Sequence, residues 1–176
     1  LLMAALQHVD RPGYAALLLR RSYADLSLPG ALMDRADDWL RGTAARWRDK
    51  EKCWVFPSGA TLTFGYLETE NDKYRYQGAE LQFIGFDELT QFTEKQYRYL
   101  FSRLRRLEGS ETPIRMRAAS NPGGLGHDWV KLRWALGSVP QPAREEASAA
   151  DRIFIPARLE DNPYVDQAVY RLSLAE

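Results

Sequence analysis

The stretch from Leu81 to Glu88, which reads LQFIGFDE, decides the fold. Residues 81–86 are largely apolar and too few for a helix, a pattern that favours a buried strand. Two adjacent acids, Asp87 and Glu88, end this strand. Because open α/β sheets bind ligands at the carboxyl ends of their strands, the sequence predicts a site here.

Strand and helix patterns alternate on both sides of this stretch. Residues 1–9 have the apolar pattern of the end of a helix. Further strands are predicted over residues 14–19 and 114–119, with a hairpin over 53–67. Helices are predicted from a cap at Ser27 to Leu40, from a capping box at Thr93 to Leu107, and onward from a cap at Asp128. This order predicts an α/β domain with a largely parallel sheet flanked by helices.

The composition excludes several classes of protein. A hydrophobic fraction of 45% in 176 residues excludes a disordered tail, and the single cysteine excludes a disulfide framework or a Cys-based zinc site. No apolar run approaches the roughly 18 residues of a membrane span. The 24 basic and 24 acidic side chains balance, so there is no global attraction to nucleic acid. The opening residues, LLMA, lack an initiator Met, and we expect an excerpt of a longer protein.

The two acids have two possible readings. Adjacent residues on an extended backbone point in opposite directions, so Asp87 and Glu88 are expected to do different work. In P-loop nucleoside triphosphatases the first such acid holds magnesium through its hydration shell, and the second orients the attacking water. The alternative is that both are solvated loop acids before the Thr93 cap, and spacing alone leaves both readings open.

A glycine-rich loop, SNPGGLG over residues 120–126, follows the predicted strand 114–119. If that strand is parallel to 81–86, Ser120 and Asn121 lie beside the acids, where they could sense the terminal phosphate of a nucleotide. The alternative is an ordinary flexible turn. A phosphate-binding loop of the G-x-x-x-x-G-K-[ST] form is absent, since no Gly-Lys pair occurs in the chain.

Three segments in this order carry a resemblance to a known family. They are ALLLRRSY at 16–23, FIGFDELTQF at 83–92 and SNPGG at 120–124. Together they resemble the ATPase domain of the phage terminase large subunit, the motor that packages DNA into viral capsids. The resemblance implies a P-loop NTPase fold of the RecA/ASCE type with ATP and Mg²⁺ as cofactors. It places the phosphate loop upstream of Leu1, so the domain is N-terminally truncated here.

The resemblance also assigns roles to single residues. Asp87 matches the acid that holds Mg²⁺ through water, and Glu88 matches the catalytic glutamate. Ser120 and Asn121 match the motif that senses the nucleotide and couples hydrolysis to movement. The chain is therefore expected to be an ATPase within the intact protein, and the isolated fragment is expected to be inactive.

Arginines are the candidates for charge stabilisation and for DNA contact. Arg75 resembles the arginine finger that a neighbouring subunit donates, although Gln77 stands where an arginine beside Gly78 is expected. Sequence-independent binding to DNA phosphates is predicted for a basic group on and after the Thr93 helix, namely Arg98, Arg103, Arg105 and Arg106. The alternative for each group is a solvated surface charge.

The predicted organisation is an ATPase domain without its phosphate loop over 1–137 and a linker over 138–176 that begins a bridge toward a nuclease domain. The bridge rests on a resemblance at 153–157 and 161–164, with a short strand at 153–155 and a helix after Asn162 and Pro163.

The resemblance implies several partners: double-stranded DNA bound without sequence preference, further copies in a ring at the capsid portal, and the terminase small subunit. No membrane is expected. The location implied is the host cytoplasm, transiently on the procapsid. A helicase-like P-loop ATPase and a non-catalytic α/β interaction module stay open as alternatives.

Overall fold

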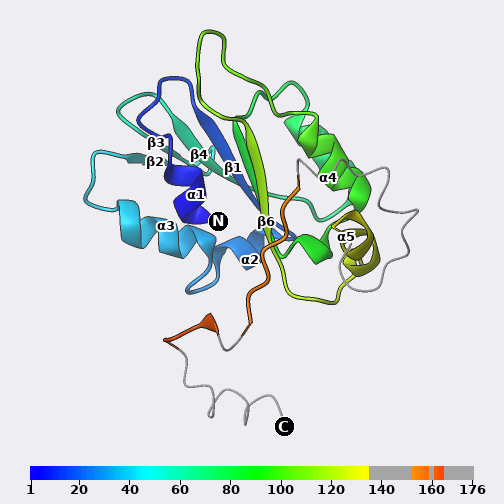
Figure 1. The fold of residues 1–176 in the computed structure, drawn as a ribbon. Coiled ribbons are helices and arrows are strands. Elements are labelled where there is room, and N and C mark those ends of the chain that lie inside the picture. The colour runs from blue at the N-terminus through cyan, green and yellow to red at the C-terminus, as the bar shows by residue number, and fades with distance from the viewer. Residues whose placement is uncertain (135–151, 159–160, 165–176) are drawn as a thin grey trace. The chain divides into compact units, whose positions relative to one another are not determined.

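The computed structural model describes residues 1–134, 152–158 and 161–164 (Figure 1). The chain divides into two units, Leu1–Val130 and Lys131–Glu176. The first unit contains the sheet and the candidate acids. The predicted boundary between 137 and 138 lies outside the described residues and stays a prediction.

A six-stranded sheet of order β2-β3-β4-β1-β5-β6 forms the centre of the first unit. The strands β4, β1, β5 and β6 are parallel, whereas β2 and β3 are antiparallel additions at one edge. The predicted α/β fold with a largely parallel sheet is therefore confirmed. The strands are β1 Ala15–Arg20, β2 Arg46–Arg48, β3 Cys53–Val55, β4 Thr61–Tyr66, β5 Phe83–Asp87 and β6 Arg115–Ala119.

Helices cover both faces of this sheet, and strand alternation sorts the core between them (Figure 1). On one face, Ala16 and Leu18 of β1 pack with α1 (Leu2–Leu6), α2 (Tyr23–Ser27) and α3 (Leu32–Leu40). On the other face, Phe86 of β5 contacts Phe92 and Tyr97, with ring centroids 5.0 and 5.5 Å apart, beneath α4 (Glu94–Phe101). Because β1 and β5 are covered on both sides, their sequences are continuous apolar runs.

The predicted cap at Ser27 is wrong. Ser22 instead caps the short helix α2 through a capping box with Asp25, and Ser27 ends that helix, its hydroxyl donating to the Tyr23 carbonyl at 3.3 Å. Pro29 restricts the preceding residue to an extended conformation, so a helix cannot run on from Ser27. The next helix, α3, begins at Leu32 without a side-chain cap.

The capping box of Thr93 and Gln96 is confirmed, but α4 ends at Phe101 and not at Leu107. Beyond it, Leu104 pairs with Leu81 in an isolated parallel bridge. The Arg105 N–H donates to the Leu81 carbonyl at 2.9 Å. This pairing with a distant segment takes the place of further helical hydrogen bonds and still buries Leu104.

The C-terminal part of the described chain differs from two predictions. Helix α5 (His127–Arg133) begins at His127, so Asp128 lies in its first turn and does not cap it. Residues 152–158 contain no strand, because the described residues offer Ile153–Ile155 no partner strand. The predicted helix after Pro163 and most of the predicted linker lie outside the described residues.

The polar stretch between β4 and β5 contains a 3-10 helix, η1 (Glu70–Tyr76), and a second one, η2 (Leu89–Gln91), follows Glu88. Within the described ranges, no helix is long and apolar enough to cross a membrane.

Candidate functional site

The carboxyl ends of the four parallel strands meet at one edge of the sheet. In the strand register, Arg20 of β1 is paired with Tyr66 of β4, and Asp87 of β5 is paired with Ala119 of β6. The residues just after these ends therefore share this edge. They include the two predicted acids and the loop that begins at Ser120.

Asp87 lies beside a cation. Its Oδ2 is 2.7 Å from Nε of Arg20, and each side chain is only 22% exposed. The contact is an ion pair between the last residue of β1 and the last residue of β5. Burial raises the pKa of the Asp87 carboxyl, the Arg20 guanidinium opposes this rise, and the charge of Glu88 adds to it. Arg20 therefore favours the ionised form of a carboxylate that burial disfavours.

Glu88 adopts the left-handed conformation, with φ 57° and ψ 59°. The extended backbone expected for the acid pair thus ends at Asp87. A left-handed non-glycine residue costs about 1–2 kcal/mol, and such residues cluster at functional sites. The carboxylate accepts hydrogen bonds from the backbone N–H of Asn121 at 3.3 Å and from its Nδ2 at 3.4 Å. Asn121 therefore donates one hydrogen bond to each carboxylate oxygen of Glu88.

Ser120 lies one residue earlier in the same loop and contacts Thr90. The Thr90 N–H donates to Oγ of Ser120 at 3.1 Å, and the two hydroxyls are 3.0 Å apart. The structure thus brings Ser120 and Asn121 to the acids. Sequence reasoning missed Thr90, whose only signal was its place two residues after the acid pair.

Arg75 lies on η1, close to the same edge but paired within its own chain. Its Nη2 is 2.9 Å from Oδ1 of Asp72, and its guanidinium lies 4.6 Å from the centre of the Tyr66 ring. Half of its side chain is exposed. The 3-10 helix is anchored by Glu70, which pairs with Lys73 and accepts a 2.7 Å hydrogen bond from the Thr93 hydroxyl.

The comparison with known families decides the identity. The family model of the terminase large subunit, T4-like-virus type, N-terminal region, matches residues 34–135, which is more than half of the chain. The chain belongs to this terminase large subunit family. The matched region includes the acid pair and the Ser120 loop, and the membership gives the chain a role in phage DNA packaging. No curated protein matches it.

The four arginines predicted to contact DNA in this terminase lie at the end of α4 and directly after it. Arg98, Arg105 and Arg106 are exposed, and Arg103 is half-buried with its guanidinium 5.1 Å from the centre of the Tyr99 ring. Within the described part of the chain, none of the four forms an ion pair. They remain available to an anionic partner.

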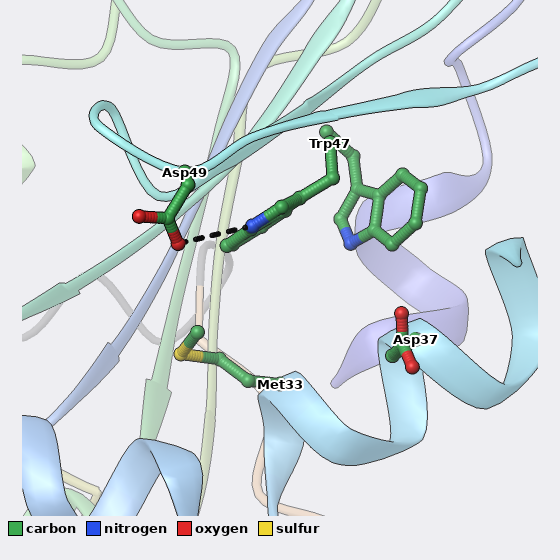
Figure 2. Close-up of a pocket in the computed structure, with 5 residues that line it drawn as sticks. Met33, Asp37, Trp47 and Asp49 are labelled. Atoms are coloured by element: carbon green, nitrogen blue, oxygen red, sulfur yellow. Dashed lines mark hydrogen bonds between the residues drawn. The ribbon is translucent and has the colours of Figure 1, made fainter.

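The terminase chain also has a hollow of about 190 Å³ away from the acids (Figure 2). It is lined by Met33 and Asp37 of α3 together with Trp47, Asp49 and Trp54 of the antiparallel edge. Asp49 accepts a hydrogen bond from the Trp47 indole at 3.4 Å (Figure 2). The two acids do not favour an anionic nucleotide here, so the strand ends stay the candidate site.

Proposed function

We propose that this chain is part of the ATP-hydrolysing motor of a phage terminase, which translocates double-stranded DNA into the procapsid. One observation carries the proposal. Asp87 and Glu88 lie at the end of a parallel strand, at the carboxyl edge of the sheet, and Asn121 donates two hydrogen bonds to Glu88 there. Family membership supplies the packaging role. The fold is in keeping with a P-loop NTPase of the RecA/ASCE type.

Asp87 would hold Mg²⁺ through water. Magnesium keeps several waters and usually takes only one or two protein carboxylates, so a dedicated cluster of ligands is not required. This suits the site, since no group of three or more acidic, histidine or cysteine ligands occurs among the described residues. Arg20, 2.7 Å from Asp87, helps keep the carboxylate ionised. When bound with ATP, the ion would offset charge on the phosphates.

Glu88 would orient and polarise the attacking water. A general base must present its carboxylate in a fixed direction, and Asn121 provides this by donating to both oxygens. A change at the bound nucleotide would move the Asn121 side chain and the Ser120 hydroxyl. Ser120 and Asn121 would thereby link the state of the nucleotide to the position of their loop.

The remaining assignments concern partners. Arg75 would act as an arginine finger toward the site of a neighbouring copy in a ring at the portal, after release from Asp72. Arg98, Arg103, Arg105 and Arg106 would contact DNA phosphates without reading bases. The small subunit and the procapsid are the other partners that we propose, with the motor acting in the host cytoplasm.

The proposal is tested on the full-length terminase subunit, by measuring ATP hydrolysis against Mg²⁺ concentration. Asp87→Asn should lower turnover about 100-fold and raise the Mg²⁺ concentration needed for half activity. The control is Glu108→Gln, which removes one negative charge from an exposed residue outside the site. Equal Mg²⁺ dependence in wild type and Asp87→Asn would contradict the role of Asp87.

A further inference from the structure

Thr90 is buried between the end of β5 and the loop 120–126, and it is only 5% exposed. The backbone N–H, the hydroxyl and the backbone carbonyl of Thr90 all form hydrogen bonds with residues of this loop. The Thr90 N–H donates to Oγ of Ser120 at 3.1 Å, and the Thr90 hydroxyl donates to the Asn121 carbonyl at 3.1 Å. Its carbonyl accepts from the N–H of Gly126 at 2.7 Å.

The loop lies against Thr90 without intervening side chains. A Cβ atom added to Gly124 would lie 2.8 Å from the Thr90 carbonyl oxygen, and one added to Gly126 would lie 2.9 Å from it. At the end of the loop, the Trp129 indole donates to the Phe92 carbonyl at 2.8 Å. The glycines therefore permit a close approach here, and the loop is a fitted part of the site.

The hydroxyls of Thr90 and Ser120 form a closed set with the Asn121 carbonyl. Each hydroxyl lies within 3.1 Å of that carbonyl oxygen, and the two hydroxyls are 3.0 Å apart. Each has one proton, so one donates to the carbonyl while the other donates to its fellow hydroxyl. Without the Thr90 hydroxyl, the Ser120 hydroxyl alone donates to the Asn121 carbonyl, and the side chain of residue 90 loses its hydrogen bond to the loop.

The hydrogen bonds from Asn121 to Glu88 do not hold the carboxylate firmly without the contacts between Thr90 and the loop. Its two hydrogen bonds are long, at 3.3 and 3.4 Å, and both are exposed to water. Hydrogen bonds of this length in contact with solvent contribute little by themselves. The hydrogen bonds of Thr90 to the loop are shorter and partly buried, so they do more to fix where Asn121 lies.

We propose that Thr90 is a positioning residue, whose hydroxyl holds the 120–126 loop so that Asn121 keeps the Glu88 carboxylate in its orientation. The proposal rests on the proposed function for its effect on catalysis, but the fixing of the loop stands on the contacts alone. Thr90 does not contact the nucleotide in this role. Its removal should therefore change turnover and leave nucleotide affinity nearly unchanged.

Two substitutions separate the hydroxyl from the shape of the side chain. Thr90→Val keeps the volume and removes the hydroxyl, whereas Thr90→Ser keeps the hydroxyl and removes the methyl group. In the full-length terminase subunit, Thr90→Val should lower kcat for ATP about tenfold, the equivalent of one hydrogen bond to a buried group, with KM within about twofold. Thr90→Ser should keep kcat within about threefold of wild type.

Hydrogen exchange gives a readout that does not depend on activity. Thr90→Val should speed exchange of the Gly126 amide, whose N–H is bonded to Thr90, whereas Thr90→Ser should leave it protected. Protection of the β1 amides serves as the control for folding and should stay the same in both variants.

Three results would overturn the proposal: unchanged exchange of the Gly126 amide in Thr90→Val, equal damage by Ser and Val, or a Val variant affected in KM and not in kcat. A failure of the proposed ATPase function would give a different result from a failure of the role of Thr90. A full-length protein without Mg²⁺-dependent ATP hydrolysis would refute the ATPase, while the exchange data would still decide whether Thr90 fixes the loop.

Discussion

The carboxylate of Glu88 accepts two hydrogen bonds from Asn121, one from its backbone N–H and one from its side-chain amide. These residues come from the ends of two neighbouring parallel strands, β5 and β6. The pairing joins the acid proposed to activate water to the loop proposed to report on the nucleotide. A movement of the 120–126 loop should therefore change the orientation of the Glu88 carboxylate.

Replacing Asn121 tests this pairing through charge. Asn121→Ala removes the side-chain donor, whereas Asn121→Asp also places a like charge about 3.4 Å from the carboxylate of Glu88. We expect both variants to hydrolyse ATP more slowly, with the Asp variant about tenfold below the Ala variant at low ionic strength. The gap should narrow in high salt because these groups are exposed. An Asp variant as active as wild type would contradict the pairing.

The left-handed backbone of Glu88 predicts an effect on stability. Glu88→Ala and Glu88→Gly both remove the carboxylate, but only Ala keeps the Cβ that disfavours this conformation. We expect the Gly variant to be more stable than the Ala variant by about 0.5–1 kcal/mol in urea unfolding. The reverse order would mean that Glu88 is not held in the left-handed region.

The close approach at Gly126 predicts a site intolerant of any side chain. A Cβ there would lie 2.4 Å from the Phe92 carbonyl oxygen and 2.5 Å from Nε1 of Trp129. Gly126→Ala should therefore lower the free energy of unfolding by about 1–3 kcal/mol, as overpacking does. The control is Leu125→Ala in the same loop, where the side chain is 62% exposed and the expected change is small. Equal stability of the two variants would show that the loop does not pack here.

Burial of Tyr14 predicts a loss of stability in strong alkali. Its hydroxyl donates to the Ala5 carbonyl at 2.9 Å, and burial raises its pKa to about 12. The unfolded chain loses this proton near pH 10, so between about pH 10 and 12 the folded state binds more protons and stability falls as pH rises. The expected slope is about 1.4 kcal/mol per pH unit for each such group.

Tyr76 has the same raised pKa of about 12, again because of burial. Tyr14→Phe should therefore remove about half of this alkaline slope and cost about 1 kcal/mol at neutral pH, where the hydrogen bond to Ala5 is lost. Urea unfolding at several pH values measures both effects. An unchanged slope in Tyr14→Phe would contradict the burial of this phenol.

The sequence was sufficient for features that depend on neighbouring residues. The apolar run before Asp87 and the capping box at Thr93 are local, and both appear in the structure. The end of α4 was not predictable in this way, because it depends on the pairing of Leu104 with Leu81, a distant segment. The short edge strand β2 has only three residues, too few for a pattern to stand out.

In the candidate site, too, the features that depend on neighbouring residues were predictable and those that depend on distant segments were not. Adjacent acids at a strand end, and a Ser-Asn pair after another strand, are visible as motifs. The burial of Thr90 depends on how the 120–126 loop packs on the end of β5, and the left-handed conformation of Glu88 has no signal in the residue pattern. That packing depends on the order of strands in the sheet, which residue patterns alone do not specify.

Single-turnover ATP hydrolysis by Glu88→Gln in the full-length subunit tests the proposed chemistry most directly. The substitution keeps the size of the side chain and removes the charge that would activate water. We expect hydrolysis to fall by about 100-fold or more, while nucleotide binding, measured on the same variant, stays within about threefold of wild type. Hydrolysis at the wild-type rate by this variant would contradict the assignment of Glu88 as the residue that activates water.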